Sequence, residues 1–220
     1  MEIRYLGHSS FLIKNKNIKI VTDPFDPKMV GLPYKKQGAN LITTSHNHQD
    51  HCYTEKENSA ELVIGLPGEY EINTVSITGY PTFHDNNNGL ERGKNTIFRF
   101  LIDNKTILHC GDLGHILNDE LIDEIGNIDI ALVPVGGFYT IGPQEAIKVI
   151  NQIEPKVVVP MHYKTDKHND KVFANLKTLN EFLTEFGLNP ETVDHLNKLT
   201  DNDFTDDDEK KVVVLKPIYE

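Results

Sequence analysis

Residues 43–52 read TTSHNHQDHC, and this stretch decides how the rest of the chain is interpreted. Three of the ten histidines and one aspartate fall within six positions here, namely His46, His48, Asp50 and His51. Imidazole and carboxylate groups in one short loop indicate a metal site, because both are good ligands for borderline cations. The apolar run just before the cluster predicts a buried strand, at whose end His46 and His48 point to the same side. The cluster thus offers two ligands to each of two metal ions about 3.5–4 Å apart.

A solvated polar loop and a structural metal site are the alternatives for this cluster. A structural zinc site normally fills four positions with Cys and His. The two cysteines of the chain, Cys52 and Cys110, do not stand at ligand spacing. We interpret both as small apolar packing residues. A hydrolytic site would instead need further ligands from elsewhere in the chain and one open position for water.

Three further ligand candidates stand where an apolar, strand-like run ends. His84 ends GYPTFH, Asp112 follows TILHCG, and His162 follows VVVPM. Ligands at strand ends along one edge of a sandwich can converge, because the scaffold beneath them is rigid. Taken singly, each of these residues is more often structural, and only the ordered series of seven favours metal binding.

The first half of the chain has the pattern of β-structure. Residues 3–15 and 16–24 predict two strands joined by the polar turn Asn15–Asn17. The segment 60–84 predicts two or three strands, broken at Pro67–Gly68. The segment 95–112 predicts a hairpin with its turn at residues 103–105.

The second half alternates helix and strand. Three helices are predicted, at 115–127, 142–155 and 172–187. The last is a long helix with an inward face of Phe173, Leu176, Leu179, Leu183 and Phe186. Strands are predicted at 128–135, 156–163 and 212–217, the last after an acidic connection at 200–211. Two sheets packed face to face, with helices outside, accommodate both halves as one α/β domain over residues 1–220.

The composition limits the classes of partner. Lys and Arg total 22 against 33 Asp and Glu, a net charge of −11. Such a chain repels nucleic acids and anionic membranes, and no apolar run is long enough to span a bilayer. The first residues do not read as a signal peptide, and two cysteines make no disulfide framework. We therefore expect a cytoplasmic protein with a small-molecule substrate.

The ordered series resembles the metallo-β-lactamase superfamily, whose signature is H-x-H-x-D-H followed by a separate His, Asp and final His. The words GHSSFLI, TDP, HCGDLGH and VPVGGFYT resemble its branch of small stand-alone hydrolases that includes the ascorbate-6-phosphate lactonase type. The resemblance runs from residue 7 to residue 163. It implies a four-layer αββα sandwich with the site at one edge. Members of this branch often self-associate, which makes a homo-oligomer an option.

The resemblance also implies a role for each of the seven residues. His46, His48 and His84 would bind a first metal, Asp50, His51 and His162 a second, and Asp112 would bridge both. A water held between two cations loses a proton near neutral pH. The expected activity is attack of that hydroxide on a small ester, lactone or phosphodiester, with Asp50 and Asp112 as catalytic residues. We expect Zn²⁺, with Mn²⁺ or Fe²⁺ as alternatives, because such ligands discriminate poorly.

Two other functions are compatible with the same scaffold. A non-catalytic metal-dependent binding or sensing protein is one. The full ligand set argues against it, since a site that has lost its activity tends to lose ligands. A di-iron redox protein is the other, although such proteins usually pair with a flavin domain, for which this chain has no room. Ligand-induced stabilisation without turnover would favour the first, and a coloured, iron-containing protein would favour the second.

Several residues outside the series remain open. His8 and His109 either support the ligands or are buried hydrogen-bonded imidazoles. His115, the exposed-looking His168 and His195 are expected outside the site. The segment 85–94 could form a mobile flap, with Arg92 or Lys94 reaching an anionic group of the substrate. Residues 136–143 either place Tyr139 and Thr140 as donors, with an anion at the following helix start, or form a simple turn.

Overall fold

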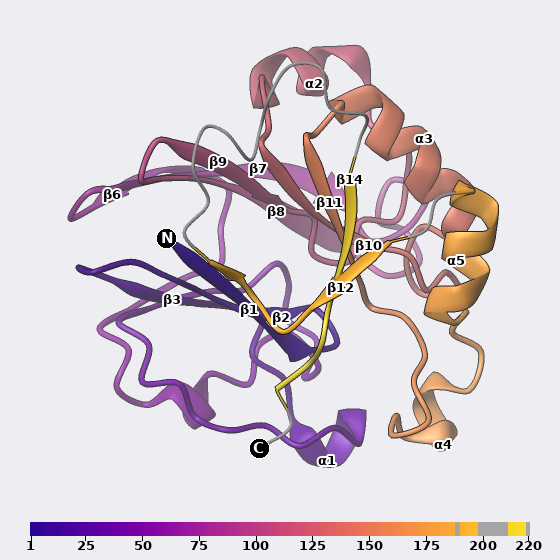
Figure 1. The fold of residues 1–220 in the computed structure, drawn as a ribbon, viewed down its shortest axis with the longest axis horizontal. Coiled ribbons are helices and arrows are strands. Elements are labelled where there is room, and N and C mark those ends of the chain that lie inside the picture. The colour runs from indigo at the N-terminus through magenta and orange to yellow at the C-terminus, as the bar shows by residue number, and fades with distance from the viewer. Residues whose placement is uncertain (188–189, 198–210, 219–220) are drawn as a thin grey trace.

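The structure is a computed structural model that describes residues 1–187, 190–197 and 211–218. Two β-sheets pack face to face, and helices lie outside them (Figure 1). Most of the expected acidic connection at 200–211 falls outside the described residues. Within the described residues, no helix combines the length and apolar character that crossing a bilayer requires.

The first sheet has the strand order β13-β1-β2-β3-β4-β5. Its strands are β1 (Glu2–Gly7), β2 (Ser10–Lys14), β3 (Lys19–Thr22), β4 (Leu41–Thr43), β5 (Leu62–Ile64) and β13 (Leu196–Asn197). β1, β2 and β3 pair antiparallel, whereas β3, β4 and β5 run parallel. β1, β3 and β4 therefore end at the same edge of the sheet.

The second sheet has the order β12-β14-β11-β10-β9-β8-β7-β6. Its strands are β6 (Gly68–Ile72), β7 (Val75–Phe83), β8 (Lys94–Ile102), β9 (Lys105–His109), β10 (Ile130–Pro134), β11 (Val157–Met161), β12 (Glu191–Val193) and β14 (Lys211–Leu215). From β6 to β9 the strands are antiparallel, and from β9 through β10, β11 and β14 to β12 they are parallel. β7, β9, β10 and β11 consequently point the same way.

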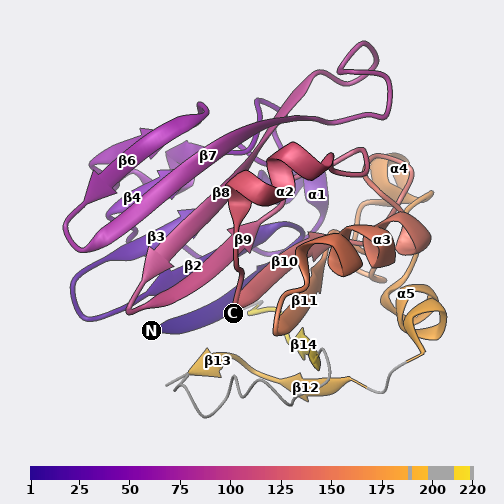
Figure 2. The ribbon, with the colours of Figure 1, turned by 90° about the horizontal axis from the view of Figure 1, so that it is seen from above.

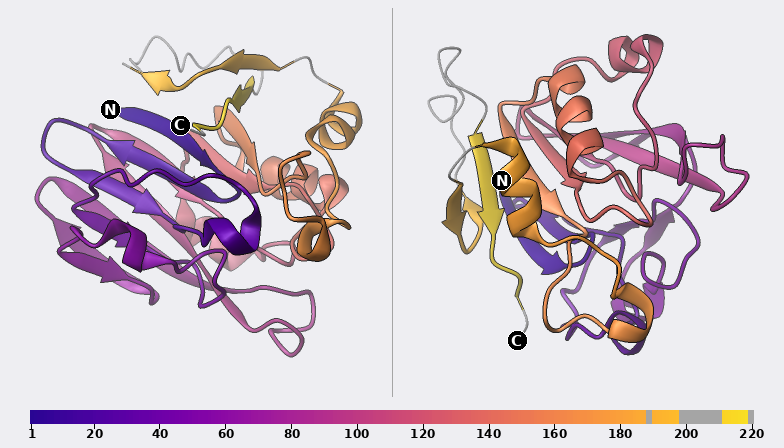
Figure 3. Two further views of the ribbon diagram at one scale, coloured as in Figure 1. Left: turned by 90° about the horizontal axis from the view of Figure 1, so that it is seen from below. Right: turned by 90° about the vertical axis from the view of Figure 1, so that its right-hand side faces the viewer.

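The helices form the outer layers of the sandwich. They are α1 (Pro27–Val30), a 3₁₀ helix (Thr54–Glu57), α2 (Asp119–Ile125), α3 (Pro143–Ile153), α4 (Asp170–Phe173) and α5 (Leu179–Phe186). α2 and α3 connect the parallel strands and cover the outer face of the second sheet (Figure 2), and α5 packs beside α3. The outer layer of the first sheet is thinner and holds α1 and the 3₁₀ helix (Figure 3). The αββα layering expected from the sequence is confirmed.

Two apolar clusters hold the layers together. The larger fills the space between the sheets and beneath α3 and α5. The smaller packs the outer face of the first sheet against the segment 25–39 and against Phe173 and Leu176. All five residues of β10 and of β11 are buried, which explains their continuous apolar sequence.

Two predicted elements differ from the structure in their bounds, and a third is confirmed. Residues 3–15 form two strands, because the chain reverses at Gly7 and His8, whose φ angles are 111° and 55°. The helix at 115–127 begins only at Asp119, where the Asn118 side chain caps it. The hairpin of β8 and β9 is confirmed, with Asp103 and Asn104 at its turn.

The predicted long helix at 172–187 is wrong, because residues 174–178 leave the helix between α4 and α5. Their backbone pairs elsewhere: the Lys177 N–H donates to Gly136 O at 2.7 Å, and the Lys164 N–H donates to Lys177 O at 2.8 Å. Thr178 then starts α5 with a capping box that includes Glu181. The apolar residues of α4 and α5 pack in different clusters. The apolar pattern at 172–187, which is continuous in the sequence, therefore belongs to two separate cores.

Candidate metal centre

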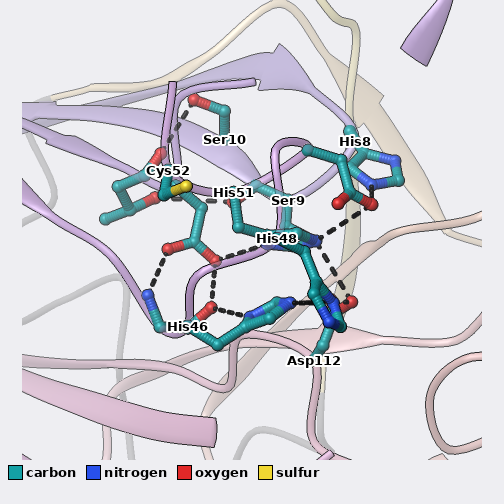
Figure 4. A network of polar contacts seen from close by, with 12 residues as sticks. His8, Ser9, Ser10, His46, His48, His51, Cys52 and Asp112 are labelled. Carbon is teal, nitrogen blue, oxygen red and sulfur yellow. Dashed lines mark hydrogen bonds and ion pairs between the residues drawn. The ribbon is translucent and has the colours of Figure 1, made fainter. Parts of the chain in front are cut away.

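The seven residues of the ordered series all follow strands that end at one edge of the sandwich. The cluster at 46–51 follows β4, His84 follows β7, Asp112 lies beyond β9, and His162 follows β11. The structure brings together all seven, from both sheets. Figure 4 labels His46, His48, His51 and Asp112 among them. All but His48 are buried.

The Asp112 carboxylate lies at the centre of this group. Its Oδ2 atom is 3.1 Å from His51 Nε2, 3.3 Å from His84 Nε2 and 3.4 Å from His162 Nε2. The Nε2 atom of His46 is 4.0 Å away. One carboxylate oxygen thus faces histidines of both predicted ligand sets, which is the arrangement that bridging requires.

The ligand atoms fall into groups that correspond to the two predicted sets. His46, His48 and His84 each offer an atom within 4.8 Å of the others. A second group holds Asp50, His51 and His162 within the same limit, and it also includes His8. The geometry therefore suits both sets, and the ligand role of each residue stays a prediction.

Several buried atoms here have no hydrogen-bond partner among the described residues. They include Oδ1 of Asp112, and also Nε2 of His51 and of His162, whose approaches to Asp112 Oδ2 do not have hydrogen-bond geometry. A buried polar atom without a partner costs about 1–3 kcal/mol. Several such atoms converging at one place fit a bound cation, which would satisfy them together. Imidazole and carboxylate donors without thiolate suit Zn²⁺, Mn²⁺ or Fe²⁺.

The charges of the site reinforce one another. Burial raises the pKa of Asp112, but His162 and His51 beside it hold that pKa well below its usual range. Burial lowers the pKa of His51, yet the carboxylates of Asp112 and Asp50 raise it well above its usual range. The carboxylates are thus ionised in a buried place and attract positive charge.

Two glycines allow the loops of the site to approach closely. A Cβ atom on Gly111 would lie 2.4 Å from Ser45 Cβ, and its φ of +52° is left-handed. A Cβ atom on Gly136 would lie 2.0 Å from the carbonyl oxygen of His162. Because no side chain fits at either position, the turns after β9 and β10 pack directly against the loops that carry the ligands.

Asp23, which follows β3, is a site residue that the sequence analysis did not single out. Its Oδ2 accepts from His51 Nδ1 at 2.8 Å and from Ser45 Oγ at 2.6 Å, and its Oδ1 accepts from the Ser45 N–H at 2.7 Å. Burial raises the pKa of Asp23, but His109 and His51 lower it below its usual range. The bond fixes a proton of His51 on Nδ1 and leaves the lone pair of Nε2 for a cation. Its position in the word TDP, at the end of a strand, is the signal that could have found it.

Three histidines outside the ordered series, His8, His109 and His168, are buried. His8 is buried, with Nε2 3.2 Å from Asp50 Oδ2. His109 places Nε2 2.7 Å from Ser9 O, as a buried hydrogen-bonded imidazole. The expectation that His168 is exposed and outside the site is wrong, since it is only 4% exposed and its Nε2 lies 3.4 Å from His8 Nδ1.

A cleft of about 420 Å³ adjoins the site, and His48, Asp50, His84 and Asp112 form part of its lining. Met29, Val172 and Phe173 add apolar surface to it. The cleft is therefore large enough for a small molecule and has one polar, site-facing wall.

Arg92 lines the same cleft from the segment 85–94. Its guanidinium carbon lies 4.7 Å from the centre of the Tyr139 ring. The segment itself is organised by Asp85, whose carboxylate accepts four backbone N–H groups at 2.8–3.1 Å, from residues 87, 89, 91 and 92. Arg92 also lines a neighbouring hollow of about 310 Å³ together with Lys94.

The hydroxyl groups of residues 139 and 140 bond to the backbone. Tyr139 donates to Val172 O at 2.7 Å, and Thr140 donates to Ile141 O at 3.1 Å. The reading of 136–143 as a strand–helix turn is therefore the better one, although the Tyr139 ring still lines the cleft.

Comparison with known proteins agrees with the fold and the site. Residues 2–162 match the family model described as a β-lactamase superfamily domain. The chain therefore belongs to the metallo-β-lactamase superfamily, within its group of metal-dependent hydrolases.

Three similar proteins define that group more closely. A UPF0173 metal-dependent hydrolase of Desulforamulus reducens is 30% identical over 197 residues, covering 75% of this chain and 85% of the relative. One of Pyrococcus abyssi is 33% identical over 193 residues, with the same shares. The solved structure of a candidate Zn-dependent hydrolase of the metallo-β-lactamase superfamily from Thermotoga maritima is 38% identical, covers 97% of both chains and has a TM-score of 0.75.

Proposed function

We propose that this metal-dependent hydrolase cleaves a small ester, lactone or phosphodiester at a site that holds two divalent cations. The observation that carries the proposal is the position of Asp112 Oδ2, within 3.4 Å of histidines from both groups. Two such cations would polarise the substrate and lower the pKa of a water molecule to near neutrality.

Each residue of the ordered series has a defined task in this proposal. His46, His48 and His84 would hold the first cation, Asp50, His51 and His162 would hold the second, and Asp112 would serve both. Asp50 also lines the cleft, where it can orient the attacking water. Asp23 keeps His51 Nε2 free for the cation by accepting the proton of Nδ1. The alternatives of a binding protein and of a di-iron protein gain no specific support from the structure.

Zinc is the cation that we propose, with manganese or iron as alternatives. The donor set contains nitrogen and oxygen atoms but no thiolate. Zinc accepts such a set in hydrolytic sites. The similar Thermotoga maritima protein, described as a candidate Zn-dependent hydrolase, supports the choice.

The cleft supports a small substrate that carries an anionic group. Arg92 lines both the cleft and the neighbouring hollow, whereas Lys94 lines only the hollow. The apolar side chains of Met29, Val172 and Phe173 suit the body of such a molecule. The net charge of −11 disfavours a polyanion such as nucleic acid. A cytoplasmic location is part of this proposal. It is compatible with Cys52 and Cys110, whose thiols are free in the structure.

Metal content of the purified protein tests the proposal. We expect about two equivalents of zinc by elemental mass spectrometry, fewer in Asp112→Ala, and no change in Asp123→Ala, which removes an exposed carboxylate on α2. The zinc-loaded protein is then assayed with chromogenic esters, lactones and bis(p-nitrophenyl) phosphate. One equivalent or none after reconstitution with zinc or manganese would contradict the two-cation site.

A further inference from the structure

His8 lies inside the site, although the ordered series does not include it. It follows β1, its side chain is fully buried, and its ring centre is 4.1 Å from that of His162. Its carbonyl oxygen accepts from the Tyr5 hydroxyl at 2.7 Å and from the His162 N–H at 2.8 Å. Its Nε2 is 3.2 Å from Asp50 Oδ2. His8 is therefore either an additional ligand or a hydrogen-bond donor that acts on Asp50.

The surroundings of His168 decide between the two roles. The backbone N–H of Thr165 donates to His168 Nδ1 at 3.1 Å, and the Thr165 hydroxyl lies 2.8 Å from the same atom. A backbone N–H can only donate, so Nδ1 must present its lone pair. The proton of the neutral His168 ring is consequently on Nε2.

The position of the proton on His168 also determines the position of the proton on His8. Nε2 of His168 is 3.4 Å from Nδ1 of His8, so the protonated nitrogen of the first ring donates to the second. His8 then carries its own proton on Nε2, the atom that faces Asp50 Oδ2 (Figure 4 shows His8 beside the site). A nitrogen that carries a proton has no lone pair left for a metal.

We propose that His8 and His168 are positioning residues, which orient Asp50 through a one-way chain of hydrogen bonds from the Thr165 amide. This inference rests on the proposed role of Asp50 at the second cation. His8 fixes one carboxylate oxygen of Asp50 and is not itself a ligand. The chain links the site to a loop 160 positions away in the sequence.

The loop that carries His168 is anchored by its neighbours. The Asn169 N–H donates to Val30 O at 2.9 Å, and the Asn169 side chain donates to Met29 O at 3.1 Å. A Cβ atom on Gly31 would lie 2.6 Å from Asn169 N, so the loop packs tightly on the end of α1. His168 therefore has a rigid support, as a positioning residue requires.

The ring protons can be located directly by long-range ¹H–¹⁵N NMR on the full-length, ¹⁵N-histidine-labelled protein, both metal-free and loaded with diamagnetic Zn²⁺. We expect neutral rings with the proton on Nε2 for both His8 and His168, assigned by the signals missing in His8→Gln and His168→Gln. A proton on Nδ1 of His8 would free its Nε2 for the metal and would overturn the inference.

A matched pair of variants supplies a second readout. In His8→Gln the side-chain amide reaches the position of Nε2 and can still donate to Asp50, whereas in His8→Asn it reaches only the position of Nδ1. By chelator competition, we expect His8→Asn to weaken binding of the second zinc roughly 10- to 100-fold, and His8→Gln to keep it within about threefold. An equal loss in both variants would mean that the imidazole itself is a ligand.

The two tests separate this inference from the proposed function. If the wild-type protein binds no metal, the two-cation proposal fails, while the ring protons of the metal-free protein still decide the role of His8. If the wild-type protein binds two zinc ions but His8 carries its proton on Nδ1, only the positioning role fails. Thermal unfolding of each variant shows that a loss of zinc does not reflect a loss of fold.

Discussion

The two sides of the metal centre are built in different ways. On one side, His46, His48, Asp50 and His51 come from six consecutive positions that follow a single strand. On the other side, His8, His162 and His168 come from two turns that are far apart in the sequence, and they meet only through tertiary contacts. Local spacing therefore reveals the first side, whereas the second becomes visible only when both sheets are in place.

Support from neighbouring groups also differs between two residues of the first side, His51 and Asp50. His51 is oriented by Asp23, a charged partner that lies directly behind it. Asp50 is held by two imidazoles in series that end at a backbone amide. If both devices position ligands of the same cation, disturbing either one should weaken the same binding event.

The largest effect is expected for Asp23→Asn. The amide nitrogen of Asn would face His51 Nδ1, so the His51 proton would move to Nε2 and remove that atom from the metal. We expect the affinity for the second zinc to fall roughly 10- to 100-fold, measured by chelator competition. Asp129→Asn alters a carboxylate that accepts from Thr106, away from the site, and should bind zinc as the wild type does. Unchanged zinc affinity in Asp23→Asn would show that the contact with Asp23 does not position His51 for the metal.

Arg92→Ala tests the cleft on the side formed by the segment 85–94. We expect KM for an anionic ester to rise about tenfold with a smaller change in kcat, since one charge-assisted hydrogen bond contributes roughly 1.5–3 kcal/mol. Lys94→Ala, which alters only the neighbouring hollow, should change KM less. Steady-state kinetics with a neutral ester of the same size provides the control, and unchanged kinetics in both variants would exclude an anion-binding role.

Gly111→Ala tests whether the two sides depend on close backbone approach. The new Cβ would meet Ser45 in addition to the strain of a left-handed φ. Gly187, at the end of α5, is left-handed with φ 75° and ψ 15° and has nothing within 4 Å, so Gly187→Ala carries the strain alone. We expect Gly187→Ala to lower the free energy of unfolding by about 1–2 kcal/mol and Gly111→Ala by about 1–3 kcal/mol more. Urea denaturation of the metal-free variants measures both, and equal losses would mean that the contact with Ser45 is unimportant.

The smallest effect concerns the pH dependence of the segment 85–94. Burial raises the pKa of Asp85, but backbone N–H groups, that of Arg92 first, lower it to about 2. Because the folded pKa lies below the unfolded one, the stabilisation is present above about pH 4. It is lost as the pH falls towards 2. In metal-free protein, Asp85→Asn should therefore show a shallower loss of stability between pH 4 and pH 2 than the wild type. Identical slopes in denaturation at each pH would contradict this assignment.

The sequence by itself determined the α/β class, most of the strands and the identity of the seven residues that converge. It could do so because alternating and continuous apolar runs set which segments are buried, and because ligand types at strand ends are local features. The HNHQDH cluster could be recognised for the same reason, because its spacing is a local feature that does not depend on the rest of the chain.

Only the tertiary structure decided how the remaining residues act. Residues 172–187 divide into two helices because the backbone of residue 177 pairs with the chain near Gly136 and with Lys164. Asp23 supports His51, and His168 is buried against His8, through contacts that span 28 and 160 positions. The burial of these side chains and the direction of their hydrogen bonds depend on which loops contact one another at the edge of the two sheets. No local pattern in the sequence predicts those contacts.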